Sequence, residues 1–201
     1  MDISIKKIDN SKLSYVDLSN IQFGKVYSDH MFVADYTDER WSSFSIVPYD
    51  NLKIPPGNFT LHYGQSVFEG LKGYRGDNGR IHVFRPYDNH KRMNISARRL
   101  CMPDIPEEIF IDGLKALLQI DKDWVPDQKG TALYIRPFMF GNDEYIGIKP
   151  SDNYKFIIFT CPVGSYYSEA LKVKIELNYA RAVAGGTGYA KVAGNYAASL
   201  L

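Results

Sequence analysis

The sequence is poor in cysteine, nearly free of net charge and without a long hydrophobic run. It has 2 cysteines, and neither Cys101 nor Cys161 belongs to a C-x-x-C pair or a Cys/His cluster, so neither a disulfide framework nor a metal site is predicted. Basic residues number 24 and acidic residues 23, and the net charge of +1 gives no reason to expect a nucleic-acid or membrane partner. Residues 1–10 lack the apolar core of a signal peptide and no run approaches membrane-spanning length, so a cytoplasmic location is predicted.

What is present is an ordinary globular composition with many aromatic residues. The 201 residues suffice for one large domain, or for one domain and part of another. The chain has 15 tyrosines and 11 phenylalanines but 2 tryptophans. This excess of tyrosine favours pockets that need apolar rings with hydroxyl tips, and a tyrosine-rich core or dimer interface is the alternative.

Local patterns predict a hairpin followed by two helices. The turn 76–79, Gly-Asp-Asn-Gly, joins strands at 71–75 and 80–85. Asp88 is expected to cap a helix that runs to Cys101, because apolar residues then recur at spacings of four and three. A second amphipathic helix is expected from Pro106, in its first turn, to Lys122.

The rest of the chain consists mainly of strand-like runs, which predict an α+β fold. Upstream of the hairpin we expect a strand with a turn at 28–29, an extended segment and a loop with a short helix, over residues 23–34, 43–49 and 61–75. Downstream, strands are predicted over residues 131–140, 154–161 and 171–179. Periodicity is lost around 161–169, which predicts a hinge or domain boundary, and an apolar helix is expected to begin at 195.

Lys191 is the sharpest single candidate for chemistry. Glycines at 185, 186, 188 and 194 would let a cofactor approach the backbone beside it, although a solvated loop lysine is the alternative. The residue before it is alanine and the residue after it is valine, so the phosphate-loop motif is absent. The segment also lacks the third glycine of a dinucleotide fingerprint.

A series of ordered motifs gives this lysine a context. In chain order they are Phe23-Gly24, Asp29-His30-Met31, His62-Tyr63-Gly64, Val67-Phe68-Glu69-Gly70-Leu71-Lys72, Arg75-Gly76, Arg92-Met93, Tyr134-Ile135-Arg136-Pro137, Pro162-Val163-Gly164, Gly186-Thr187-Gly188, Lys191 and Gly194-Asn195-Tyr196. With these motifs the chain resembles the branched-chain amino-acid aminotransferases, which are fold-type IV enzymes dependent on pyridoxal 5'-phosphate (PLP). The resemblance extends from about residue 21 onward.

The resemblance implies three cofactor-binding residues. Lys191 matches the Schiff-base lysine of the family, which would also carry the proton in catalysis. Tyr196 matches the tyrosine that bonds the phenolate oxygen of the cofactor, and its alternative is a ring packed at a helix start. Arg92 matches the phosphate-binding arginine, whose planar fork suits a phosphate. Without the match, a solvated basic helix face would be the better interpretation of Arg92.

The resemblance also implies a pocket that accepts both branched-chain and acidic substrates. Arg136 would meet the distal carboxylate of glutamate or 2-oxoglutarate. Tyr134 and Arg136 are two residues apart in a predicted strand and should point to one face. The aromatic residues implied to shape the apolar part of the pocket, each with ordinary core packing as its alternative, are Phe23, Tyr63, Phe68, Tyr134 and Tyr166.

The implied organisation is a small domain followed by the beginning of a larger one. Residues 1–165 would form an α/β domain with a mainly antiparallel sheet and two helices, 166–172 a linker, and 173–201 the start of the PLP domain. The implied reaction is transamination of Leu, Ile or Val with 2-oxoglutarate by a homodimer. The acidic partner of the pyridine nitrogen would lie beyond residue 201, so this chain alone is expected to be inactive.

Two other functions stay open at this point. One is a non-catalytic dimerising or regulatory fragment. The other is a related fold-type IV D-amino-acid aminotransferase or lyase, which the motifs at 134–137 and 194–196 disfavour.

Overall fold

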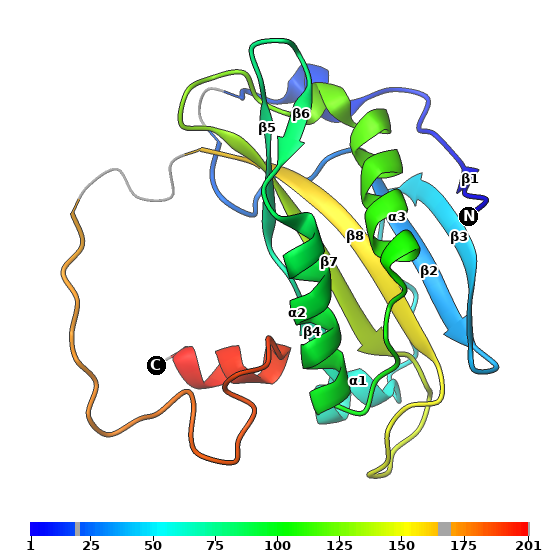
Figure 1. The fold of residues 1–201 in the computed structure, drawn as a ribbon, viewed down its shortest axis with the longest axis vertical. Helices are drawn as coiled ribbons and strands as arrows, with labels where there is room; N and C mark the ends of the chain where they lie inside the picture. Colours follow the sequence, from blue (N-terminus) through cyan, green and yellow to red (C-terminus); the bar gives the residue numbers. More distant parts are fainter. Residues whose placement is uncertain (19–20, 165–169, 201) are drawn as a thin grey trace.

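The computed structural model describes residues 1–18, 21–164 and 170–200, and a curved mainly antiparallel sheet dominates it (Figure 1). Neighbouring strands follow the order β1-β3-β2-β8-β7-β5-β6, and β4 pairs with β7 beside this path. Pairing is antiparallel except between β1 and β3. The strands are β1 Ser4–Ile5, β2 His30–Thr37, β3 Arg40–Pro48, β4 Ser66–Phe68, β5 Leu71–Arg75, β6 Ile81–Val83, β7 Ala132–Gly141 and β8 Tyr154–Val163.

Two long helices, α2 and α3, cover one face of this sheet (Figure 1). The α-helices are α1 Phe59–Tyr63, α2 Pro86–Arg99 and α3 Glu107–Ile120, and the 3-10 helices are η1 Lys12–Tyr15, η2 Lys122–Trp124 and η3 Ala193–Ser199. Strands and helices are thus grouped apart, as predicted for an α+β fold. In the described part of the chain no helix is long and apolar enough to cross a membrane.

The core lies between these two helices and the sheet. Phe110 of α3 stacks on Phe156 of β8 with ring centroids 6.0 Å apart. Gly113 brings α3 so near β2 that a Cβ there would lie 2.7 Å from the ring of Phe32. Leu133 and Ile135 of β7 are fully buried beneath the helices. Because strand residues alternate between faces, the even-numbered residues of β7 are presented on the opposite face.

The predicted hairpin and both long helices are confirmed, but their first residues differ from the prediction. Helix α2 begins at Pro86, and Arg85 occupies the N-cap position with a φ of 50° and no side-chain cap bond. Asp88 was wrongly predicted as the cap, because a proline whose φ is already helical starts the helix three residues earlier. Asp88 instead pairs with Arg85 at 2.6 Å. Pro106 is the N-cap of α3, one position before its first turn.

Two strand predictions are wrong. Residues 171–179 form no strand, and Val173 and Ile175 are 89% and 82% exposed. No strand of the described residues pairs with residues 171–179. Alternation of apolar and polar residues does not form a strand without a partner strand. The first long strand begins at His30 rather than at 23. The helix expected from 195 is present as the 3-10 helix η3, which begins two residues earlier at Ala193.

The structure describes only part of the region 161–169, in which a hinge is predicted. Strand β8 continues through Val163, so the first residues of the region 161–169 belong to the sheet. Residues 165–169 lie outside the described part of the chain. After them the chain runs away from the sheet and returns so that η3 lies beside β4 (Figure 1).

Candidate active site

A cavity of about 700 Å³ lies on the face of the sheet opposite α2 and α3. Strands β4, β7 and β8 and helix η3 supply its walls. Alternation along β7 places residues 134, 136 and 138 on this face, as the two-residue spacing of Tyr134 and Arg136 predicts. The lining is Phe23, Ser66, Phe68, Tyr134, Arg136, Phe138, Phe159, Lys191, Ala193 and Tyr196. It is therefore an aromatic cavity with two cationic side chains.

The backbone of Lys191 is fixed to the folded core on two sides. Its N–H donates to Ser96 Oγ of α2 at 2.8 Å. Its carbonyl accepts from the N–H of Phe68 in β4 at 3.1 Å, and a single β-bridge pairs Val67 with Val192. With the backbone held this way, the side chain extends into the cavity.

Asn195 holds the loop that precedes Lys191 in shape. Its amide donates to the carbonyls of Thr187 and Ala190, both at 2.9 Å. The hydroxyl of Thr187 donates back to Asn195 Oδ1 at 2.6 Å. Asn195 is buried, so these bonds replace the water that would otherwise satisfy the turn.

The amine of Lys191 lies among aromatic groups. Its Nζ donates to the hydroxyl of Tyr196 at 3.0 Å and is 4.1 Å from the centroid of the Phe68 ring. The rings of Phe68 and Tyr196 are themselves 5.1 Å apart. Among the ion pairs of the described residues, none involves Lys191. A cation here is stabilised by ring faces rather than by a carboxylate.

Arg136 forms the second cationic wall. Its Nη2 donates to the hydroxyl of Tyr134 at 2.9 Å, and its guanidinium carbon is 4.5 Å from the Phe68 ring centroid. Phe23 closes this side, with its ring centroid 5.2 Å from that of Tyr134. The Nε of Arg136 is buried and has no hydrogen-bond partner among the described residues. A buried donor without an acceptor is costly, and an anionic ligand in the cavity would satisfy it.

Arg92 is near this group but does not line the cavity. Its Nε and Nη2 bind the two carboxylate oxygens of Glu69 at 2.6 and 2.7 Å. These hydrogen bonds with Glu69 raise the pKa of Arg92, against a smaller opposing effect of burial, and Tyr196 contributes to the same rise. The fork that was predicted to bind a phosphate is therefore occupied by Glu69, and the two N–H groups of Nη1 and the second N–H of Nη2 remain for another anion.

One predicted residue of the aromatic pocket wall is not brought to the cavity. Tyr63 lies on α1, where its ring centroid is 4.9 Å from that of Phe59, and it is not part of the lining. Tyr166 lies outside the described residues.

Several residues of the site were not predicted from the sequence. Phe138 could have been found, because it continues the alternation of Tyr134 and Arg136 along one strand. Glu69 belongs to the motif at residues 67–72. Its burial depends on Arg92, 23 positions away, and no local pattern in the sequence indicates that pairing. Ser66, Ser96, Phe159, Ala193 and the role of Asn195 carry no local signal.

Comparison with known proteins shows which proteins this chain is similar to. No family model matches the chain. Curated relatives do: branched-chain-amino-acid aminotransferase 2 of Bacillus subtilis (strain 168) is 46% identical over 198 residues, which are 96% of this chain and 54% of that protein. The chain is a relative of the branched-chain aminotransferases. The branched-chain-amino-acid aminotransferase of Mycolicibacterium smegmatis is also 46% identical, over 92% of this chain and 51% of its own length.

Solved structures of branched-chain aminotransferases share the fold. One that was solved with pyridoxamine 5'-phosphate has a TM-score of 0.64 and 26% identity, over 84% of this chain and 53% of that one. The enzyme of the thermophilic archaeon Thermoproteus uzoniensis with norvaline has a TM-score of 0.64 at 24% identity, over 85% of this chain and 54% of that one. The predicted fold class and the resemblance are thereby confirmed. The chain spans about half the length of the curated branched-chain aminotransferases it matches.

Proposed function

We propose that this chain is part of a branched-chain-amino-acid aminotransferase that depends on PLP. It would exchange the amino group of Leu, Ile or Val with 2-oxoglutarate, giving branched-chain 2-oxo acids and glutamate. One observation carries the proposal: the amine of Lys191 contacts the hydroxyl of Tyr196 at 3.0 Å within the aromatic cavity that also contains Arg136. The relatives from Bacillus subtilis and Mycolicibacterium smegmatis are branched-chain aminotransferases, which supports the reaction class.

The residues of the cavity fit PLP chemically. Lys191 has an amine without a carboxylate partner in the described structure, which suits covalent attachment to an aldehyde. The hydroxyl of Tyr196 would donate to the ring oxygen of the cofactor, and the Nη1 of Arg92 would bind its phosphate. When bound, PLP accepts the electron pair that the α-carbon of the substrate gives up.

Lys191 would also act as the acid and base of the reaction. Once its Nζ is neutral, it would take the proton from the α-carbon of the substrate and return it during product formation. The Tyr196 hydroxyl beside it limits the positions that Nζ can occupy. The backbone bonds with Ser96 and Phe68 keep the base of the side chain fixed while Nζ moves.

The two kinds of substrate would use different parts of one pocket. The aromatic walls would take the branched side chain of Leu, Ile or Val. The unpartnered Nε of Arg136 and its neighbouring N–H groups would bind the distal carboxylate of 2-oxoglutarate. Phe23, Phe68 and Tyr134 are the proposed apolar wall, and Tyr63 and Tyr166 are proposed to join it in the complete enzyme.

The same proposal covers organisation and location. We propose a small domain over residues 1–165, a linker over 166–172 and the beginning of the PLP domain over 173–201. A cytoplasmic homodimer is proposed, with this chain inactive when it is alone.

Borohydride labelling tests the cofactor assignment without needing turnover. The chain is incubated with PLP, reduced and digested, and mass spectrometry locates the phosphopyridoxyl group. The label should lie on Lys191 and disappear in Lys191→Ala. The control Lys91→Ala, which alters an exposed lysine of α2, should keep it. Equal labelling of several lysines in the wild-type chain, or a label that survives Lys191→Ala on the same peptide, would contradict the assignment.

A further inference from the structure

Ser96 of α2 makes two hydrogen bonds that join the backbones of Arg92 and Lys191. Its hydroxyl donates to the carbonyl of Arg92 at 2.9 Å and accepts from the N–H of Lys191 at 2.8 Å. The side chain is fully buried, and a hydroxyl has one hydrogen to donate, so the two bonds have defined directions. One buried side chain thus connects the arginine proposed to bind phosphate with the lysine proposed to bind the cofactor covalently.

The face of α2 that carries Ser96 also carries other contacts with the segment 185–196. Residues 92, 96 and 99 are spaced by four and three, which places them on one side of the helix. Arg99 donates from Nη2 to the carbonyl of Gly185 at 3.4 Å. The segment that contains the lysine therefore lies against α2 over about two helical turns (Figure 1).

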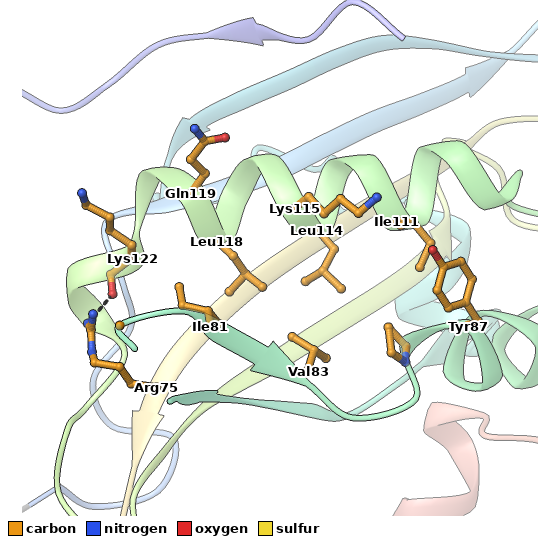
Figure 2. Close-up of a pocket in the computed structure, with 12 residues that line it drawn as sticks. Arg75, Ile81, Val83, Tyr87, Ile111, Leu114, Lys115, Leu118, Gln119 and Lys122 are labelled. Carbon is orange, nitrogen blue, oxygen red and sulfur yellow. Dashed lines mark hydrogen bonds between the residues drawn. The ribbon is translucent and has the colours of Figure 1, made fainter. Parts of the chain in front are cut away.

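Helix α2 is itself packed firmly in the molecule. Met93 and Ala97, on its buried side, are fully buried and belong to the main core. Figure 2 shows the ring of Tyr87, in the first turn of α2, extending toward Ile111 of α3, and both residues line one groove between the two helices and β6. The helix is therefore a fixed base for the bonds of Ser96.

The residues on either side of Lys191 are packed in the same core. Ala190 and Val192 are 3% and 5% exposed and belong to it. Removal of the Ser96 hydroxyl would deprive the N–H of Lys191 of its acceptor. The bond from the N–H of Phe68 to the carbonyl of Lys191 would remain, so the segment should stay folded while the position of Lys191 becomes less defined.

We propose that Ser96 is a positioning residue that sets the distance between the phosphate-binding and aldehyde-binding groups of the site. This inference rests on the proposed function, in which Arg92 binds the phosphate of PLP and Lys191 binds its aldehyde carbon. Both groups are attached to one rigid ring, so both anchors engage together only when they are held at matching positions. Ser96 does not line the cavity and acts through Arg92 and Lys191.

Comparison of PLP with pyridoxal, which lacks the phosphate, tests this match. The chain is titrated with each aldehyde, reduced with borohydride and digested, and mass spectrometry gives the half-saturating concentration for labelling Lys191. In the wild-type chain this concentration should be at least about tenfold lower for PLP, as expected for a charge-assisted phosphate contact. The different reactivity of the two aldehydes cancels when variants are compared.

Variants of Ser96 should change this preference for PLP. Ser96→Ala should lower it about fivefold, which corresponds to the loss of one hydrogen bond, whereas a purely structural defect would weaken labelling by both aldehydes equally. Ser96→Thr keeps a hydroxyl that can bond the carbonyl four residues earlier and should retain the preference. An unchanged preference in Ser96→Ala, or an equal loss in Ser96→Thr, would overturn the proposal.

The matched control is Ser28→Ala. Ser28 is also fully buried, and its hydroxyl accepts from Thr160 at 2.8 Å outside the cavity lining. This variant should keep the wild-type preference for PLP. A loss equal to that of Ser96→Ala would show that any buried serine has the same effect and would refute the role of Ser96.

Amide hydrogen exchange without cofactor separates this proposal from the proposed function. Ser96→Ala should speed exchange of the Lys191 amide about fivefold and leave that of Leu117 in α3 unchanged. Preferential labelling of Lys191 in the wild-type chain, together with unchanged exchange in Ser96→Ala, would overturn this proposal alone. If the wild-type chain shows no preferential labelling of Lys191, the proposed function fails and this proposal fails with it.

Discussion

Removing Arg92 should destabilise the chain through the carboxylate that it leaves behind. Glu69 is fully buried, and its two oxygens accept from Arg92 at 2.6 and 2.7 Å and from Asn89 at 2.8 Å. Arg92→Ala deletes the two charge-assisted bonds and keeps the buried charge. Stripping one partner from a buried ion pair is far more costly than losing a surface pair, because the remaining charge has no compensation.

The magnitude follows from how exposed each partner is. Loss of one partner from a fully buried pair costs about 3–5 kcal/mol. The Arg92 side chain is 55% exposed, so water can enter part of the space that alanine vacates and reduce the cost. We therefore expect Arg92→Ala to lower the free energy of unfolding by about 2–3 kcal/mol. The double variant Glu69→Gln/Arg92→Ala should recover about 1 kcal/mol, since a neutral amide is cheaper to bury than a carboxylate.

Urea unfolding followed by far-ultraviolet circular dichroism measures these values. The control is Arg98→Ala on the same helix, because Arg98 pairs with Asp104 and both side chains are largely exposed, at 65% and 45%. It should cost less than about 1 kcal/mol. Two results would refute the reasoning: an Arg92→Ala effect no larger than that of Arg98→Ala, or a double variant no more stable than Arg92→Ala alone.

Three further outcomes are expected. Gly113→Ala should lower the melting temperature, because its Cβ would lie 2.7 Å from the Phe32 ring and the overpacking, about 1–3 kcal/mol, exceeds the gain in helix propensity of about 1 kcal/mol. Burial raises the pKa of Tyr154 to about 12, so its stabilising contribution is present below the ordinary pKa of 10.0 and is lost as pH rises through 12. Tyr154→Phe should flatten that alkaline loss of stability, which urea unfolding at several pH values would show. Asn195→Ala should speed amide hydrogen exchange around Lys191 and leave that of α3 unchanged.

The parts of the fold that depend on neighbouring residues could be predicted from the sequence. The turn at 76–79 has Gly79 at a φ of 75°, a conformation that glycine adopts without strain. The apolar periodicity of α2 and α3 reflects a single buried face and needs no knowledge of the partner. The position of Tyr134 and Arg136 on one face of β7 follows from strand geometry in the same way.

The parts of the fold that depend on residues distant in the sequence could not be predicted from the sequence. The run 171–179 alternates as clearly as any strand in the chain, yet no described strand pairs with it. Strand β4 was assigned to a loop because its three residues become a strand only by pairing with Phe138–Phe140 of β7. The resemblance supplied Lys191, Tyr196 and Arg136 as members of one site, but it could not show that Tyr63 packs on α1.

Arg92 shows why residue type and position do not by themselves settle how a side chain acts. An arginine at this place fits a phosphate through its fork, and that fork is already bound to Glu69. Because the pair fixes Nε and Nη2, the orientation of the guanidinium is set before any ligand arrives, and the N–H groups of Nη1 with the second N–H of Nη2 are left to bind. A ligand phosphate would therefore meet a pre-oriented donor whose charge is partly neutralised. The guanidinium needs little reorientation when the phosphate binds, which favours one ligand geometry. Its charge is partly neutralised by Glu69, which weakens its attraction for other anions.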